Sequence, residues 1–512
     1  MNFDLLIMPM KLLRLAAVSA LVLCTATTVS ADLLYNPVVL VTSGPPETGS
    51  STGFATSISI FQQGVAGQTT PISTTTYNTD SNAGLRLVTA RNSATGTLTN
   101  NPGVADAAAK GLLYSGTQYV YNAGYDAAAL TASVSGSTGG VNNNPRSFGQ
   151  TNVTNNIASA ATVLQAHLDA HIAGAIRGAV GDDTGTAIYS AGTSATSNVT
   201  TRGSGGWRNF ADNTILNTAV PASSTLHNVR TIELLASDVV GGRLFGTSAN
   251  AGMTIQNGLY TIDMTAGIGP PATGTAPALY IGTPGTISSG SFGPSEFALF
   301  DDPTNPAALN LGYDTAYIVE GATDSDGGIQ KWTWDGAAWT LAYTLADPGL
   351  GGAFGERAYF GLAGQLDAAT NQITLYTTVV DTPDVAFPPL TKLQQVTDTG
   401  AASTFITLAT LDPAVSGSAF QGVALSAAAA SGLAGDYNGD GTVNAADYTV
   451  WRDGGSPDSS QAGYNLWKAN FGNPPGAGNS SAVPEPASAM LLLLGLAILG
   501  YGRRSGPASL CE

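Results

Sequence analysis

The stretch "GGIQKWTWDGAAWTLAYTL" at residues 327–345 indicates how the middle of the chain folds. The side chains of residues 329–334 alternate between two faces, which is typical of a β-strand. One face carries Ile329, Lys331 and Thr333, and the other carries Gln330, Trp332 and Trp334. Asp335 and Gly336 follow, a pair that suits a tight hairpin turn, and a second run begins at Trp339. The stretch therefore predicts two antiparallel strands joined by a short turn.

The same kind of unit recurs throughout residues 32–430. Short apolar or alternating runs are separated there by turns rich in Gly, Asn and Asp. Examples are "LLYNPVVLVTSG" (33–44), "GLYTIDM" (258–264) and "RAYFGLAGQLDAATNQITLYTTV" (357–379). Runs with turn signals at this spacing predict an all-β fold, either a sandwich, a barrel or a propeller.

Consecutive hairpins of this kind resemble the blades of β-propellers. About 400 residues allow six to eight blades of about 40–60 residues each, and we expect about seven. The resemblance implies that "AFQGVAL" (419–425) pairs with the strand near Val38–Val41 and so closes the ring. Two or three β-sandwiches in tandem are the alternative.

Residues 155–181 depart from this pattern and allow two interpretations. Apolar residues at suitable spacing predict one face of a helix; they are Val163, Leu164, Leu168, Ile172 and Ile176. A strand that includes "AIRGAVGD" (175–182) fits the same sequence. On a helix, His167 and His171 would share a face with the spacing of a zinc pair, but the glutamate of the HExxH motif is missing.

The charge balance restricts the class of partner. Charged residues make up 10% of the 512-residue chain, against roughly 25% in an average soluble protein, and the net charge is -17. An acidic chain without a cluster of Lys or Arg cannot neutralise phosphates, which excludes nucleic acid as a partner. Acidic oxygen ligands suit calcium instead.

The first 31 residues have the features of a secretory signal peptide. Lys11 and Arg14 precede an apolar run, and small residues end at Ala31 before Asp32. The only cysteines are Cys24 and Cys511, so the sequence predicts no disulfide within the mature body.

The C-terminal stretch, residues 483–505, carries a sorting signal or an anchor. A short acidic and proline-rich motif comes first, an apolar run of about 15 residues follows, and two arginines end it; the motif and arginines are Val483, Pro484, Glu485, Pro486, Arg503 and Arg504. This order closely resembles a PEP-CTERM sorting signal. The resemblance implies a transient membrane helix, processing by an exosortase-type protease and release to the cell surface or extracellular matrix. A plain C-terminal membrane anchor is the alternative.

The stretch "GDYNGDGTVNAADYTVW" (435–451) has the spacing of a calcium loop. Oxygen-bearing residues recur at loop positions 1, 3, 5, 7, 9 and 12; they are Asp436, Asn438, Asp440, Thr442, Asn444 and Asp447. Gly441 takes the position of the sharp turn. The closing aspartate and the absence of an entering helix resemble a type I dockerin repeat.

A second half of this repeat follows, so residues 431–473 form one small module. "YTVWRDGG" (448–455) aligns with "YNLWKANFG" (464–472), but Gly463 replaces the closing aspartate, and we expect no metal in the second half. Ala445 and Ala446 stand where dockerins contact cohesin, which disfavours a cohesin-like partner. Residues 474–482 are a linker, and the module is interpreted as a calcium-stiffened stalk.

Several further residues are candidates for catalytic, calcium-binding or sugar-binding sites. Candidate acid/base or calcium carboxylates are Asp182, Asp183, Asp301, Asp302, Asp324 and Asp326, and candidate sugar-stacking tryptophans are Trp207, Trp332, Trp334 and Trp339. Polar turns and core packing explain these residues more simply. The sequence offers no defensible catalytic set, so it favours an exported protein with a binding or structural role at the surface or matrix. The alternative is an extracellular hydrolase or lyase that acts on polysaccharide from a propeller scaffold.

Overall fold

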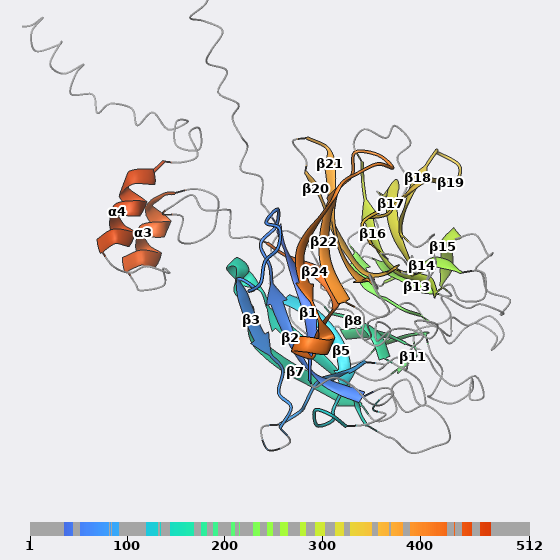
Figure 1. Cartoon of the computed structure of the whole chain (residues 1–512), viewed down its shortest axis with the longest axis horizontal. Helices are drawn as coiled ribbons and strands as arrows, with labels where there is room; N and C mark the ends of the chain where they lie inside the picture. Colours follow the sequence, from blue (N-terminus) through green and yellow to red (C-terminus); the bar gives the residue numbers. More distant parts are fainter. Residues whose placement is uncertain are drawn as a thin grey trace, which may run out of the picture.

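The computed structural model describes two parts of the chain, a β-sheet body and a C-terminal helix pair. The described residues are 35–44, 52–80, 82, 84–91, 119–131, 134, 144–167, 176–181, 188–192, 206–209, 214–215, 229–235, 243–248, 257–264, 277–282, 292–302, 313–321, 328–350, 357–367, 370–381, 390–427, 435, 443–452 and 461–472. Strands dominate them, as the sequence predicts, so the body is all-β (Figure 1).

The described strands form five antiparallel sheets. The largest has the order β24-β1-β2-β4-β5-β6-β7, with β3 also paired to β2; its strands are β24 (Ser418–Ala427), β1 (Tyr35–Ser43), β2 (Thr52–Ile60), β3 (Ser73–Thr76), β4 (Val88–Arg91), β5 (Tyr119–Tyr125), β6 (Arg146–Asn152) and β7 (Ser159–His167). The second contains β8 (Ile176–Gly181), β9 (Ile188–Gly192), β10 (Gly206–Asn209) and β11 (Thr214–Ile215). The third contains β12 (Glu233–Leu235), β13 (Arg243–Ser248), β14 (Gly258–Asp263) and β15 (Ala278–Gly282).

The last two sheets have the same simple order. One contains β16 (Phe292–Phe300), β17 (Thr315–Gly321), β18 (Gly328–Trp334) and β19 (Trp339–Leu345). The other contains β20 (Arg357–Asp367), β21 (Gln372–Asp381), β22 (Leu390–Thr397) and β23 (Phe405–Leu411). The described helices are η3 (Thr154–Asn156), α2 (Pro413–Ser416), α3 (Ala445–Arg452) and α4 (Gln461–Asn470).

The first and last strands of the body pair with each other. β24 runs antiparallel to β1, with Val38 opposite Ala424, Val39 opposite Val423 and Val41 opposite Phe420. This confirms the predicted pairing of residues 419–425 with the strand near Val38–Val41. The two ends of the body are therefore held together by main-chain hydrogen bonds.

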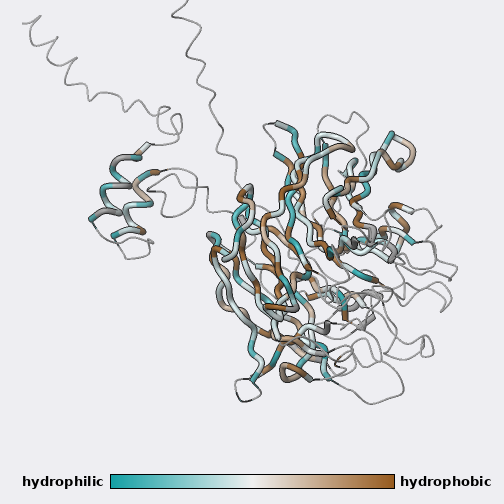
Figure 2. Tube along the Cα trace, in the orientation of Figure 1, coloured by the Kyte–Doolittle hydropathy of each residue, from teal (hydrophilic) through white to brown (hydrophobic). Residues whose placement is uncertain are grey.

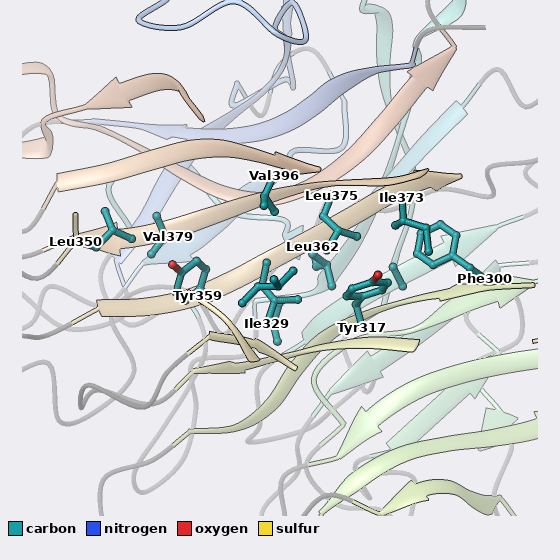
Figure 3. Packing of buried hydrophobic residues seen from close by; sticks show 13 residues of the cluster. Phe300, Tyr317, Ile329, Leu350, Tyr359, Leu362, Ile373, Leu375, Val379 and Val396 are labelled. Atoms are coloured by element: carbon teal, nitrogen blue, oxygen red, sulfur yellow. The ribbon is translucent and has the colours of Figure 1, made fainter. Parts of the chain in front are cut away.

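The sheets pack in a succession that returns to its starting point. β5 packs on β8, β8 on β12, β13 on β16, β16 on β20 and β20 on β24. Among the described residues, five apolar clusters occupy the spaces between these neighbours, and a sixth lies between strands of the large sheet. Figure 3 shows one of them, between the sheets of β17 and of β21, where Tyr317 and Ile329 face Leu362 and Leu375.

Burial on both faces explains the composition of the strands. In β18, Ile329 belongs to the cluster on one side of its sheet and Trp332 to the cluster on the other. A strand covered on both faces needs apolar residues at successive positions, whereas a half-exposed strand alternates strictly. The brown segments of Figure 2 accordingly run along strands inside the body.

The hairpin that the opening stretch predicts is present. Trp334 of β18 lies opposite Trp339 of β19, and the loop between them has four residues, two more than the tightest hairpin. Asp335 donates its N–H to the carbonyl of Ala338 at 3.1 Å. Gly336 has φ of 99°, a left-handed conformation that glycine adopts without steric cost.

The helical interpretation of residues 155–181 is wrong for residues 159–167 and 176–181, and residues 168–175 lie outside the described residues. Residues 159–167 form β7, which pairs with β6, and residues 176–181 form β8, which pairs with β9. His167 is the last residue of β7, and His171 lies outside the described residues. The helix-like spacing of the apolar residues was overridden by strand pairing, because a sheet edge offers partners that a lone helix lacks.

Candidate functional site

The helix pair at residues 443–472 contains the described part of the calcium-loop module. The helices α3 and α4 lie side by side (Figure 1), and aromatic side chains such as Tyr448 and Tyr464 hold them together. The ring centroids of Tyr448 and Trp467 are 5.1 Å apart, and those of Trp451 and Tyr464 are also 5.1 Å apart. Equal reciprocal distances indicate that the two helices are related by an approximate two-fold axis. They also match the alignment of the two half-repeats, in which each tyrosine corresponds to a tyrosine and each tryptophan to a tryptophan.

The start of α3 is fixed by a reciprocal capping arrangement. The N–H of Asn444 donates to Oδ2 of Asp447 at 2.7 Å, and the N–H of Ala446 donates to Oδ1 of Asn444 at 2.7 Å. Such pairs satisfy N–H groups that lack partners within the helix. Asn444 and Asp447 are therefore held beside each other in one fixed orientation.

Two hydrogen bonds tie the second helix to the same point. The indole Nε1 of Trp467 donates to the carbonyl of Asn444 at 2.8 Å, and the N–H of Gly472 donates to the carbonyl of Val443 at 2.7 Å. Val443 itself is fully buried. The end of the loop thus sits on the helix pair, as expected for an apolar residue under a metal loop.

Asn444 and Asp447 carry oxygen atoms of the kind that calcium prefers as ligands. The side chain of Asp447 is completely buried, and a buried carboxylate requires hydrogen bonds or a metal to offset its desolvation. Asn444 and Asp447 are the two predicted calcium ligands within the described residues. The other four, Asp436, Asn438, Asp440 and Thr442, lie outside them.

The second half of the module differs at its closing position. Gly463 is buried within α4, and glycine offers no side-chain oxygen there. The aromatic face of the repeat is retained, whereas this ligand position is not.

A second cluster of charged and hydroxyl groups lies between two sheets of the body. Asp398, directly after β22, accepts a hydrogen bond from Lys331 Nζ at 2.8 Å and from Tyr343 Oη at 2.7 Å, and also one from the hydroxyl of Tyr317. The N–H of Gly400 donates to its Oδ1 at 2.9 Å. The Asp398 side chain is only 3% exposed. We call these four side chains the Asp398 cluster.

The pKa shifts of the cluster follow from its geometry. Burial alone would raise the pKa of Asp398, but the hydrogen bonds from Lys331, Tyr317 and Tyr343 lower it below its ordinary value. Burial would lower the pKa of Lys331, and the hydrogen bond and charge of Asp398 raise it overall. Burial, followed by the contact with Asp398, raises the pKa of Tyr343. The ion pair is therefore stable across the neutral range and joins the two sheets.

Sequence reasoning did not predict this cluster. Lys331 and Asp398 are 67 positions apart, and Tyr317 and Asp398 are 81 apart, so no local pattern links them. Isolated charged residues within apolar runs are the only signal: Lys331 in β18 is one of few charged residues in these strands.

The remaining candidate residues are dispersed. Asp301 is exposed and Asp302 is partly exposed just after β16. The other candidate carboxylates lie outside the described residues; they are Asp182, Asp183, Asp324 and Asp326. The third histidine of the sequence, His227, also lies outside them, as do the sorting residues Val483, Pro484, Glu485, Pro486, Arg503 and Arg504. Trp207 lies in β10. Trp332 is buried in a core cluster, whereas Trp334 and Trp339 are partly exposed. In the part of the chain that the structure describes, no group of three or more His, Cys, Asp or Glu could hold a metal.

Comparison with known families tests the C-terminal signal. Residues 482–505 match the PEP-CTERM protein-sorting motif. The match supports an exported protein that an exosortase-type system processes and directs to the cell envelope or surface. It spans the residues from which the same signal was predicted. Within the described ranges no helix has the length and apolarity to cross a membrane, and the apolar run 487–501 lies beyond them.

Comparison with whole proteins adds little. A search of curated proteins found no match. Among solved structures, the chain is similar to a provisionally assigned 6-phosphogluconolactonase from Bacteroides uniformis, with 13% identity over 74% of this chain and 84% of the other and a TM-score of 0.33. A similarity at this level carries no argument about fold or activity.

Proposed function

We propose that the protein is an exported surface or matrix component whose body is a six-bladed β-propeller with a binding or scaffolding role. The observation that carries this proposal is the pairing of β1 with β24, combined with sheet packing that returns to its first member. The large sheet is weakest between β4 and β5, which share the single residue pair Val88 and Tyr125, so we divide it there into β24-β1-β2-β3-β4 and β5-β6-β7. With the four smaller sheets, this division favours six blades over the seven that the chain length suggested. A ring of small sheets leaves only short, protected edges, which suits a protein outside the cell.

The helix pair is proposed to act as a calcium-stabilised stalk of dockerin-like type. Its ligands would be Asp436, Asn438, Asp440, Asn444 and Asp447, with the carbonyl of Thr442. The buried, preoriented carboxylate of Asp447 and the fixed Asn444 support this assignment. Modules of about 40 residues rarely stay folded without a metal or disulfide, and the sequence has no cysteine here. Bound calcium would hold the loop, while the aromatic contacts hold the two helices.

The order of segments supports a role in display. The sorting motif follows the helix pair, which itself follows the body, so processing would leave the stalk at the C-terminal end. A matrix polysaccharide is the partner class that we propose for the body. A cohesin-like partner is disfavoured by Ala445 and Ala446, both exposed on α3 without a polar side chain.

Calorimetry with calcium tests the stalk. The mature protein 32–482 is compared with the same chain carrying Asp440→Ala and with a chain ending at Ala430. We expect one site in the parent, and none in either altered chain. A control variant, Asp80→Asn, removes an exposed carboxylate of the body and should keep the site. Equal calcium binding by the parent and Asp440→Ala would overturn the assignment.

Limited proteolysis provides a second measurement on the same proteins. Calcium should protect the region around Trp451 in the parent, and not in Asp440→Ala. The display role is tested separately by removal of residues 483–505, which should prevent processing and alter the cellular fraction that contains the protein. An unchanged distribution would contradict sorting by the motif.

A further inference from the structure

The body carries a surface patch of aromatic rings and carboxylates where the second and third of the four small sheets meet, that is, the sheets of β12–β15 and β16–β19. The patch consists of Tyr280, Tyr313, Trp334, Trp339, Asp301, Asp302, Asp314 and Asp335, and we call it the aromatic–carboxylate patch. All four aromatic side chains are partly exposed. Two exposed leucines flank it, Leu279 at 43% and Leu341 at 44%.

The aromatic residues are held in fixed positions by direct contacts. The ring centroids of Tyr280 and Trp339 are 5.4 Å apart, and those of Trp334 and Trp339 are 5.9 Å apart. The hydroxyl of Tyr280 donates to the carbonyl of Tyr313 at 3.4 Å. Three strands from two sheets thus place their rings side by side, with part of each ring surface open to solvent.

The carboxylates lie on the same end of the sheet. The N–H of Trp334 donates to the carbonyl of Asp314 at 2.8 Å, which joins the residues of the two groups directly. Asp335 follows Trp334, and its Oδ1 accepts the N–H of Ala337 at 2.9 Å and of Ala338 at 2.8 Å. These hydrogen bonds lower the pKa of Asp335, so it remains ionised in mildly acidic solution.

Asp314 is the most informative member of the patch. Its side chain is 1% exposed, and Oδ1 accepts the N–H of Asp302 at 2.8 Å, which directs the carboxylate toward the Asp301–Asp302 turn. Oδ2 is buried without a hydrogen-bond partner among the described residues. Burial raises the pKa of Asp314 above its ordinary value; hydrogen bonds from Asp302 and Thr315 oppose this shift, and the charges of Asp301 and Asp302 add to it. Repulsion between these carboxylates would be relieved by a cationic ligand.

Two cations of the neighbouring strands, Lys331 and Arg243, have carboxylate partners elsewhere. Lys331 pairs with Asp398, and Arg243 pairs with Asp263 at 2.9 Å, so each is engaged with a carboxylate outside the patch. Partly exposed aromatic faces and carboxylates together favour a ligand with an ammonium group, because both the ring quadrupole and the negative charges attract it.

We propose that the aromatic–carboxylate patch binds a polymer of amino sugars. Sugar rings present C–H faces that stack on tyrosine and tryptophan, hydroxyls that donate to carboxylates, and, in unacetylated amino sugars, a positive charge. The proposal rests on the proposed role as a binding component outside the cell, where such polymers occur. It identifies the class of polymer and the residues that recognise it.

The test measures binding of a glucosamine hexamer to the mature protein at about pH 5.5, where aspartates of ordinary pKa are ionised. Tryptophan fluorescence reports occupancy directly, since Trp334 and Trp339 would be covered. The paired variant Asp301→Asn/Asp335→Asn should weaken binding by about tenfold, equivalent to about 1.4 kcal/mol. The N-acetylglucosamine hexamer, which stacks alike but carries no charge, should bind about tenfold more weakly to the parent protein.

Asp80→Asn is the matched control. Asp80 is exposed, and its Oδ1 accepts the N–H of Asn82 at 2.9 Å, so it has the same turn chemistry as Asp335 in a different sheet. This variant should bind the hexamer like the parent. Trp334→Leu, checked for an unchanged thermal midpoint, should remove most of the fluorescence response and weaken binding.

Three results would overturn the inference. The first is that the paired variant and Asp80→Asn bind the glucosamine hexamer equally. The second is that the parent protein binds the glucosamine and N-acetylglucosamine hexamers equally. The third is that hexalysine binds as tightly as the glucosamine hexamer, which would identify a cationic peptide site instead. The calcium and sorting measurements do not depend on this patch. Failure here with those measurements intact would therefore reject the amino-sugar ligand and leave the proposed display role standing.

Discussion

The β-sheet body and the helix pair solve the same problem of stability in different ways. The body buries apolar residues between successive sheets, and its two ends are joined by the pairing of β1 with β24. The helix pair has two short helices, whose aromatic rings contact each other and whose ends are joined by single hydrogen bonds. A large core is self-sufficient, whereas a module this small depends on a few contacts and, in our proposal, on calcium.

A destabilising substitution should therefore have different consequences in the body and in the helix pair. In the body, clusters such as those around Tyr317 and Phe420 combine residues of two sheets, so a cavity there affects neighbours on both sides. In the helix pair, loss of one contact should loosen the module alone. A variant that unfolds one region without the other would support this difference. A variant that unfolds both regions together would contradict it.

The largest effect is expected where the body closes. Phe420 of β24 is fully buried and contacts Phe61 edge-on, with their ring centroids 5.5 Å apart. Phe420→Ala should lower the free energy of unfolding of the body by about 3–5 kcal/mol, because it leaves a cavity at the seam. Chemical denaturation measures the change. Val415→Ala, at a position that is 83% exposed, should leave the midpoint unchanged. A similar midpoint for both variants would show that the seam contributes little.

A smaller effect is expected at the Asp398 cluster. Asp398→Asn keeps the size of the side chain but leaves Lys331 without its ionic partner, which should cost about 1–3 kcal/mol in the same denaturation measurement. Asp263→Asn removes an ion pair whose carboxylate is 54% exposed, and should cost less than about 1 kcal/mol. An equal decrease in the free energy of unfolding of the two variants would mean that burial does not strengthen the ion pair of the Asp398 cluster.

The pH dependence of the body isolates the same group. The pKa of Asp398 is lower in the folded protein than in the unfolded chain. Its contribution to stability is therefore complete above the unfolded pKa of about 4 and is lost as the pH falls through the folded pKa. As the pH is lowered below about 4, the midpoint temperature of thermal unfolding should decrease in the parent. The decrease should be less steep in Asp398→Asn. Parallel curves for the two proteins would contradict this role of the carboxylate.

The smallest effect is expected in the helix pair. Trp467→Phe removes the N–H that donates to the carbonyl of Asn444 but keeps an aromatic ring. The module should lose about 1 kcal/mol, measured as faster hydrogen exchange in α3, while the body transition stays unchanged. Asn465→Ala, at an exposed position of α4, should leave the exchange rates as they are. A shift of the body transition by Trp467→Phe would show that the two regions are coupled.

Local patterns predicted much of this fold. The alternation in residues 329–334 and the Asp335–Gly336 turn correctly predict the β18–β19 hairpin, and the apolar run at 419–425 correctly predicts the seam strand. The tyrosines and tryptophans that align between the two half-repeats lie in α3 and α4, where the structure shows that they contact each other. These features succeed because neighbouring residues determine them.

Long-range contacts were less accessible. Residues 159–167 have the apolar spacing of a helix, yet pairing with β6 makes them a strand. The Asp398 cluster joins three strands and a loop, and the aromatic–carboxylate patch combines residues of β15, β18 and β19 with the turns around them. Trp334 and Trp339 were recognised as candidate sugar-stacking residues, but only the structure separates them from the buried Trp332. Such arrangements depend on which sheets become neighbours.

The seam between β1 and β24 has a consequence for biogenesis. Thr42 and Ala419, which it brings into hydrogen-bonding contact, are 377 positions apart. β1 leaves the ribosome and crosses the membrane long before its partner strand is made, so it must wait, unpaired, on the far side. Contacts between such distant segments form slowly, and unpaired edges invite aggregation in the meantime. The rate at which this seam forms, more than the stability of the finished protein, would then set how much of it reaches the cell surface.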